Sequence, residues 1–349
     1  MRARAETPFR SRAPDRTAGF VLPYVLAMIA VLSLIAALGA NALRRSQTNV
    51  LALERLDTLQ RALDAVEAET LYVFTTSNFA RSGIDLSDRV VDQTALSLGE
   101  APDESELDPA DVWLATGQTR RTLIGGVPVY VAYQDADGLI SLSSANDLVL
   151  GRLLGGFGLP PAQARGLVRK LNDYTDADHR RQFEGGERAD YRLERRPPPT
   201  NSSLRSWQEI RSILDWDEVN LSASPEFIRL LTFFTTASIP NTSTMPPEVA
   251  EAMEVDEQGL DPDQSDLADY QWVTNTYPSP RARFILTAIS PDGRSGLRRI
   301  VEAERTSTAP DQPFTRRLVI ETGIGPDEIE RLDWDGTPRL GVSASSRNR

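Results

Sequence analysis

The feature that most constrains this chain is an uncharged apolar stretch near its N-terminus. The segment from Phe20 to Leu43, FVLPYVLAMIAVLSLIAALGANAL, has 24 residues and no charged side chain. At a helical rise of about 1.5 Å per residue it reaches roughly 36 Å, and the hydrocarbon core of a bilayer is about 30 Å thick. We therefore expect a helix that spans a membrane once, with the rest of the chain folding outside the bilayer.

The residues before this stretch predict its orientation. Residues 1–19 carry five arginines against Glu6 and Asp15, a net charge of +3. Positive flanks are retained in the cytoplasm, which places the 306 residues after Leu43 on the other side. Two simple alternatives fit the same pattern. One is a removable secretory signal, for which Ala40-Asn41-Ala42 offers a cleavage site, and the other is a plain signal anchor for a periplasmic binding protein or enzyme.

Charge and motifs argue against several functions. The net charge of -12 falls to -15 without the +3 leader, which is unfavourable for nucleic-acid binding. The chain has no cysteine, so disulfide frameworks and thiolate metal sites are excluded. His179 is the only histidine, and the chain contains no G-x-S-x-G, P-loop or dinucleotide-binding motif. The sequence therefore predicts a protein that is not an enzyme.

Periodicity beyond the membrane segment predicts an α+β fold. A helical stripe continues to about Ala80, and strands joined by a Gly125-Gly126 turn follow over 122–133. Residues 143–255 read as four successive helices, one opened by a capping box at Ser206–Glu209, and a hairpin returns over 283–304. Residues 82–118 are expected to be mainly loop with a short helix over 108–116. We predict a long N-terminal helix packed on an antiparallel sheet that a large α-helical insertion interrupts.

The predicted domain organisation follows these blocks. It comprises a cytoplasmic leader (1–19), a transmembrane half-helix (20–43), the stem helix with the first strands (44–142), the α-helical insertion (143–270), the returning strands (271–325) and a partly disordered tail (326–349).

An acidic loop in the insertion is the main candidate chemical site. Six carboxylates fall within 18 residues: Asp173, Asp176, Asp178, Glu184, Glu187 and Asp190. Calcium takes six to eight oxygen ligands in irregular geometry, so such a loop could form a cation cage around the Gly185-Gly186 turn. The alternative is a solvated acidic loop neutralised by neighbouring arginines, namely Arg180, Arg181 and Arg188. A second acidic loop over 256–269 is a further candidate.

The N-terminal junction resembles a known type of leader. A short basic segment ends in Gly19, Phe20 follows, and an apolar helix with a proline begins at once, as in type IV pilins and type II secretion pseudopilins. The resemblance implies that a prepilin peptidase cuts after Gly19 and that the new N-terminus at Phe20 is methylated. Most such subunits have Glu at mature position five, where this chain has Tyr24. That Glu is thought to pair with the subunit ahead, so its loss suits a subunit at the front of a filament, and it equally suits a helix that never enters a filament.

Four downstream segments resemble the minor pseudopilin K family of type II secretion systems. They are the D-x-x-G segment at Asp135–Ser143, the acidic loop at Leu171–Tyr191, the segment Pro199–Glu209 and the segment Asn241–Pro246. The resemblance implies a pilin-like fold with an α-helical insertion, calcium in the acidic loop, and minor pseudopilins of the I and J types as partners. It also implies a role in capping and initiating the major pseudopilin filament for export of folded proteins. Location would be the inner membrane with the globular part in the periplasm. A minor pilin of another type IV system is the nearest alternative.

Overall fold

The computed structural model describes residues 21–87, 108–219, 225–253, 277–306 and 313–330. The predicted cleavage junction at Gly19 and Phe20 and the acidic loop at 256–269 lie outside the described residues. The chain divides into two compact units, residues 1–57 and residues 58–349.

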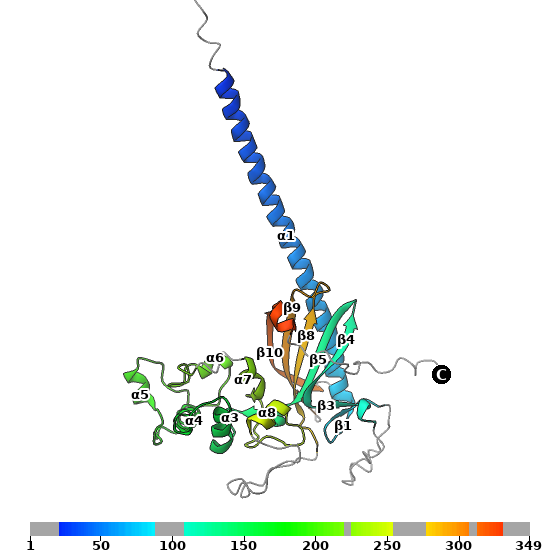
Figure 1. Ribbon diagram of the computed structural model, residues 1–349. Coiled ribbons are helices and arrows are strands. Elements are labelled where there is room, and N and C mark those ends of the chain that lie inside the picture. Colours follow the sequence, from blue (N-terminus) through cyan, green and yellow to red (C-terminus); the bar gives the residue numbers. More distant parts are fainter. Residues whose placement is uncertain (1–20, 88–107, 220–224, 254–276, 307–312, 331–349) are drawn as a thin grey trace, which may run out of the picture. The chain divides into compact units, whose positions relative to one another are not determined.

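The first unit contains the N-terminal part of helix α1 (Val21–Thr76), a continuous helix of 56 residues (Figure 1). By length and composition α1 could cross a membrane, as the sequence predicts. Its apolar side chains in this unit, such as Leu22 and Leu32, are exposed, which is what contact with lipid requires. The helix ends slightly before the predicted Ala80 because Asn78–Ala80 forms strand β1.

In the second unit, α1 is followed by a small antiparallel sheet that the sequence did not predict. Its strands are β1 (Asn78–Ala80), β2 (Gly83–Asp85) and β3 (Val112–Leu114), in that order. The predicted helix over 108–116 is wrong, since only a 3-10 turn, η2 (Pro109–Asp111), precedes β3. Gly83 is required by this pairing, because a Cβ there would lie 2.0 Å from the carbonyl oxygen of Trp113.

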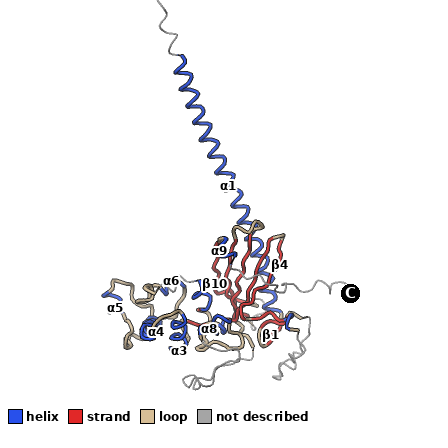
Figure 2. Tube along the Cα trace, viewed as in Figure 1, coloured by secondary structure: helices blue, strands red, loops and turns tan. Residues whose placement is uncertain are grey.

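The main sheet has five antiparallel strands in the order β10-β9-β8-β5-β4, which are labelled in Figure 1. They are β4 (Thr116–Ile124), β5 (Val127–Asp135), β8 (Arg281–Ile289), β9 (Gly296–Arg305) and β10 (Phe314–Ile324). Figure 2 shows the strands in red and the helices in blue. Both predicted hairpins are confirmed. Strands β5 and β8 are direct neighbours, with Tyr133 opposite Phe284, although the whole insertion separates them in sequence.

The C-terminal half of α1 packs on this sheet. Phe74 of the helix is fully buried and meets Phe284 of β8 edge to face, at 5.3 Å between ring centroids. A polar clamp adds to the apolar contact, since Arg299 of β9 forms ion pairs with Glu67 of α1 at 2.8 Å and with Glu321 of β10 at 2.8 Å. The predicted packing of the stem helix on an antiparallel sheet is therefore confirmed.

The insertion has a separate apolar core. Its elements are η3 (Ala136–Gly138), β6 (Ile140–Ser141), α3 (Asp147–Gly156), α4 (Pro161–Thr175), α5 (Arg188–Leu193), α6 (Trp207–Ile210), α7 (Pro225–Leu230), β7 (Leu231–Thr232) and α8 (Pro247–Ala252). Leu153, Leu171 and Phe227, all fully buried, belong to this core.

Several predictions for this part of the chain need correction. Helix α6 is a single turn, and the hydroxyl of Ser206 makes no capping hydrogen bond. The carboxylate of Glu209 accepts from the N–H of Arg205 at 2.8 Å and not from that of Ser206, so the predicted capping box does not form. Helix α3 was not predicted, because its glycines lower helix propensity. The predicted tail also begins with a helix, α9 (Pro326–Glu330), whose Ile329 is buried.

Candidate metal centre

Two helix ends position the acidic loop. Helix α4 stops at Thr175, with the backbone N–H of Asp176 donating to the carbonyl of Asn172 at 2.8 Å. Helix α5 starts with a capping box in which Glu187 accepts from the backbone and Asp190 accepts from the N–H of Glu187 at 2.9 Å. The ten residues between the C-cap Asp176 and the N-cap Glu187, which include Asp178 and Glu184, are therefore held at both ends.

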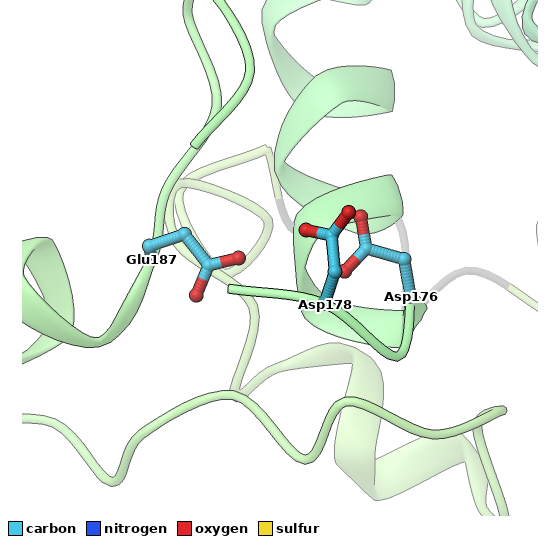
Figure 3. A group of neighbouring side chains, drawn as sticks. All are labelled: Asp176, Asp178 and Glu187. Atoms are coloured by element: carbon cyan, nitrogen blue, oxygen red, sulfur yellow. The ribbon is translucent and has the colours of Figure 1, made fainter. Parts of the chain in front are cut away.

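Three of the six predicted carboxylates come together. Asp176, Asp178 and Glu187 each offer an oxygen, and these oxygens all lie within 4.8 Å of one another. Figure 3 shows the carboxylates of Asp176 and Asp178 side by side after the end of α4, with that of Glu187 directed toward them from the segment before α5. Hard oxygen ligands of this kind suit calcium or magnesium.

Two oxygens of this cluster have no hydrogen-bond donor in the part of the chain that the structure describes. Asp176 Oδ1 and Glu187 Oε1 are buried and accept no hydrogen bond from the described residues. Burial, followed by repulsion from Asp178, raises the pKa of Asp176. Burial likewise raises the pKa of Glu187, and repulsion from Asp173 and Asp176 adds to it. Such oxygens are costly unless a cation or a proton satisfies them, so the residues present fit a bound cation.

Asp173, in the last turn of α4, contacts the backbone of the loop. Its carboxylate is fully buried and accepts from the backbone N–H of Gln182 at 3.1 Å. Gly185 packs against it, since a Cβ on Gly185 would lie 2.1 Å from Asp173 Oδ2. Burial is the main cause that raises the pKa of Asp173. Asp173 therefore fixes the fold of the loop through backbone contacts.

The other predicted ligands do not join the group of three. Asp190 is occupied by the capping box and lies 3.4 Å from Arg181, and Glu184 is exposed with a left-handed backbone (φ 65°). Among the described residues, Arg181 is the one of the three neighbouring arginines whose side chain pairs with an acid of the loop, and that acid is Asp190. The side chains of Arg180 and Arg188 are exposed and pair with none of the three clustered carboxylates.

A second buried acidic group, at the junction of the insertion and the sheet, was not predicted as a site. Asp135, at the end of β5, is fully buried and accepts from the hydroxyl of Ser279 at 2.5 Å and from that of Thr244 at 2.6 Å. Arg283 and Glu302 form a buried ion pair at 2.6 Å beside it. The D-x-x-G pattern in the sequence includes Asp135. Its partners Thr244 and Ser279 lie more than 100 residues away, so no local sequence pattern predicts the contact.

Comparisons with known proteins bear on this geometry. Residues 131–231 match the family model of type II secretion system protein K. A solved structure described as the GspK-GspI-GspJ complex from enterotoxigenic Escherichia coli type 2 secretion system is similar in fold. The identity is 14%, the match covers 76% of this chain and 97% of that chain, and the TM-score is 0.47. The comparison with curated proteins gave no match.

The matched segment runs from β5 to β7 and contains both Asp135 and the clustered carboxylates. The family match, together with an apolar N-terminal helix whose C-terminal half packs on an antiparallel sheet, supports the class of minor pseudopilins of the type II secretion system. Within that class the match is to the K type, which confirms the resemblance predicted from the sequence. The matched family is a component of the type II secretion system.

Proposed function

We propose that this minor pseudopilin caps the tip of the pseudopilus and helps to initiate its assembly for export of folded proteins. The observation that carries the proposal is the helical insertion between the neighbouring strands β5 and β8. A body of this size, tied to the middle of the sheet, obstructs the stacking of a further subunit beyond it.

Buried bonds make the insertion a fixed obstacle. Arg283 of β8 donates to the carbonyl oxygen of Leu231 in β7, and Glu302 of β9 accepts from Thr232 at 3.3 Å. Because these groups are buried, separating the insertion from the sheet would leave charges without partners, which is costly. The insertion would then stay in place while subunits assemble beneath it.

The N-terminal helix also supports a position at the tip of the pseudopilus. Tyr24 replaces the carboxylate that would pair with a subunit ahead, and its side chain is exposed on α1. The I-type and J-type minor pseudopilins and the major filament would therefore lie on one side only. The leader would be cut after Gly19 by a prepilin peptidase, Phe20 would be methylated, and the globular part would face the periplasm from a single-pass anchor in the inner membrane.

The capping proposal is tested on filaments. Gold-labelled antibodies against an epitope inserted at the exposed Gly125-Gly126 turn should mark one end of each pseudopilus. Labelling along the shaft, or filaments that form with unchanged number in a deletion strain, would contradict capping and initiation respectively.

We also propose that the cluster of Asp176, Asp178 and Glu187 binds calcium, with Asp173 shaping the loop. The two buried oxygens without donors support this assignment. When bound, the ion supplies positive charge that neutralises the clustered carboxylates and ties the end of α4 to the start of α5. Isothermal titration of the chelator-treated protein with CaCl2 should show saturable binding that Glu187→Gln weakens strongly. An unchanged isotherm in that variant would contradict this site.

A further inference from the structure

The segment of residues 180–195, which contains Glu187, exposes two large apolar side chains to solvent. Phe183 is 87% exposed and Leu193 is 83% exposed, and both exceed the most exposed of the large apolar side chains recorded on α1, Leu22 at 69%. A lone exposed apolar side chain is ordinary, but two such side chains in eleven residues of a well-tethered segment call for a partner.

Four arginines surround these two side chains in the sequence. They are Arg180, Arg188, Arg192 and Arg195, all exposed. None forms a side-chain ion pair or hydrogen bond with any residue in the described part of the chain. Of the four acids within residues 180–195, Glu187 is buried, Asp190 is half-buried in its cap, and only Glu184 and Glu194 are exposed, so exposed arginines outnumber exposed acids. The segment therefore presents cations outward on a chain whose net charge is -12.

The backbone that carries these groups is held in place. Gln182 is bonded to Asp173 through its N–H and to Arg169 at 3.0 Å through its side chain. At the other end, Arg196 donates to Asp217 at 2.6 Å, and Tyr191 is fully buried with its hydroxyl accepting from the N–H of Leu214. A surface that is ordered before binding loses less conformational entropy when a partner docks.

We propose that residues 180–195 form a docking surface for an acidic segment of another protein, with Phe183 and Leu193 as apolar anchors. Arginine and aromatic residues dominate the binding energy of protein interfaces, and charge complementarity selects an acidic partner. An anionic membrane fits less well. The net charge of -12 acts against the approach of the whole chain to an extended anionic surface, whereas a short acidic peptide is within the Debye length of the local arginines only.

The test uses the full chain in detergent micelles and a short fluorescein-labelled peptide rich in Glu and Asp around one Leu and one Phe. The control peptide carries Lys in place of each acid. Fluorescence anisotropy should show the acidic peptide binding at least about tenfold more tightly, with an affinity that falls as salt rises. Equal binding of the two peptides would overturn the proposal.

Matched variants locate the surface. Arg188→Glu with Arg192→Glu should weaken binding at least about tenfold, whereas Arg294→Glu at the β8–β9 turn, an exposed arginine elsewhere, should have no effect. Phe183→Ser should weaken binding, and Leu123→Ser on the exposed edge of β4 should not. If the two controls act as strongly as the test variants, or if vesicles of anionic phospholipid bind through these arginines while the acidic peptide does not, the surface is not the proposed one. Calcium binding measured in parallel separates a failure here from a failure of the metal site.

Discussion

The two buried acidic groups of the second unit differ in what satisfies them. At the junction, both carboxylate oxygens of Asp135 accept protein hydrogen bonds, and Glu302 is paired with Arg283. In the acidic loop, Asp176 and Glu187 each keep a buried oxygen without a donor among the described residues. The junction is therefore satisfied by protein donors and joins the insertion to the sheet, while the loop leaves two buried oxygens for the proposed calcium ion. Missing donors, and not burial of carboxylates alone, motivate the proposal of a metal site.

The largest effect should come from breaking the buried ion pair of the junction. Arg283→Met leaves Glu302 charged and unpaired and removes the bond to Leu231, so we expect a loss of about 3 to 5 kcal/mol in the free energy of unfolding. Urea unfolding followed by tryptophan fluorescence measures it.

The double variant Arg283→Met with Glu302→Leu serves as the control for this prediction. It removes both charges together, so most of the stability should return. If the double variant were as unstable as the single one, the loss would come from packing and not from the stranded carboxylate.

A calcium-dependent effect of similar size is expected only in the loop. At a hundredfold excess over its Kd, a ligand that binds the folded state alone stabilises by about 2.7 kcal/mol. CaCl2 should therefore raise the Tm of the wild type and not that of Glu187→Gln. Asp135→Asn should keep the calcium response, and equal losses in both variants would remove the distinction between the two regions.

A smaller effect is expected from Asp135→Asn in the absence of calcium. The amide preserves the shape but puts a donor group where Ser279 and Thr244 both donate, so about 1 to 3 kcal/mol should be lost. Urea unfolding of the chelator-treated protein measures the loss, and a variant as stable as the wild type would show that these bonds do not hold the junction.

The pH dependence of the loop should have the opposite sign with and without calcium. The pKa values of Asp173, Asp176 and Glu187 are raised by burial above their usual range. Without calcium, the stability contributed by these groups is present below their unfolded pKa values and is lost as the pH rises through the folded ones. With calcium bound the carboxylates must be ionised, so calcium-dependent stability should fall on acidification.

The variant Glu187→Gln tests the predicted direction of the pH dependence of stability without calcium. In chelator it mimics the protonated acid, so its stability should exceed that of the wild type at about pH 7, and the gap should close toward about pH 4. A gap that widens on acidification would contradict repulsion within the cluster.

Local patterns in the sequence predicted much of this fold. The uncharged run after Phe20, the Gly125-Gly126 turn and the Pro161 helix start are signals confined to a few residues, and α1, β4–β5 and α4 are confirmed. The small sheet escaped prediction because three-residue strands such as Gly83–Asp85 have no readable periodicity. A capping box was expected at Ser206, but the structure has one at the start of α5. There the side chains of Glu187 and Asp190 each accept from the backbone N–H of the other residue.

The candidate site was predictable as a loop but not as a set of ligands. Six acids in 18 residues marked the segment, yet only the fold decides that Asp176, Asp178 and Glu187 converge, that Asp190 is used by a cap and that Glu184 turns away. The pairing of Asp135 with Thr244 and Ser279 spans more than 100 residues, so no local pattern could have shown it.

The placement of this chain in a pseudopilus is tested most directly by the N-terminal mass of the protein recovered from membranes with and without a prepilin peptidase. We predict a mature chain that begins at methylated Phe20 only when the peptidase is present, and loss of this processing in Gly19→Leu. A chain that keeps Met1, or one that starts near Ala42 regardless of the peptidase, would contradict the assignment.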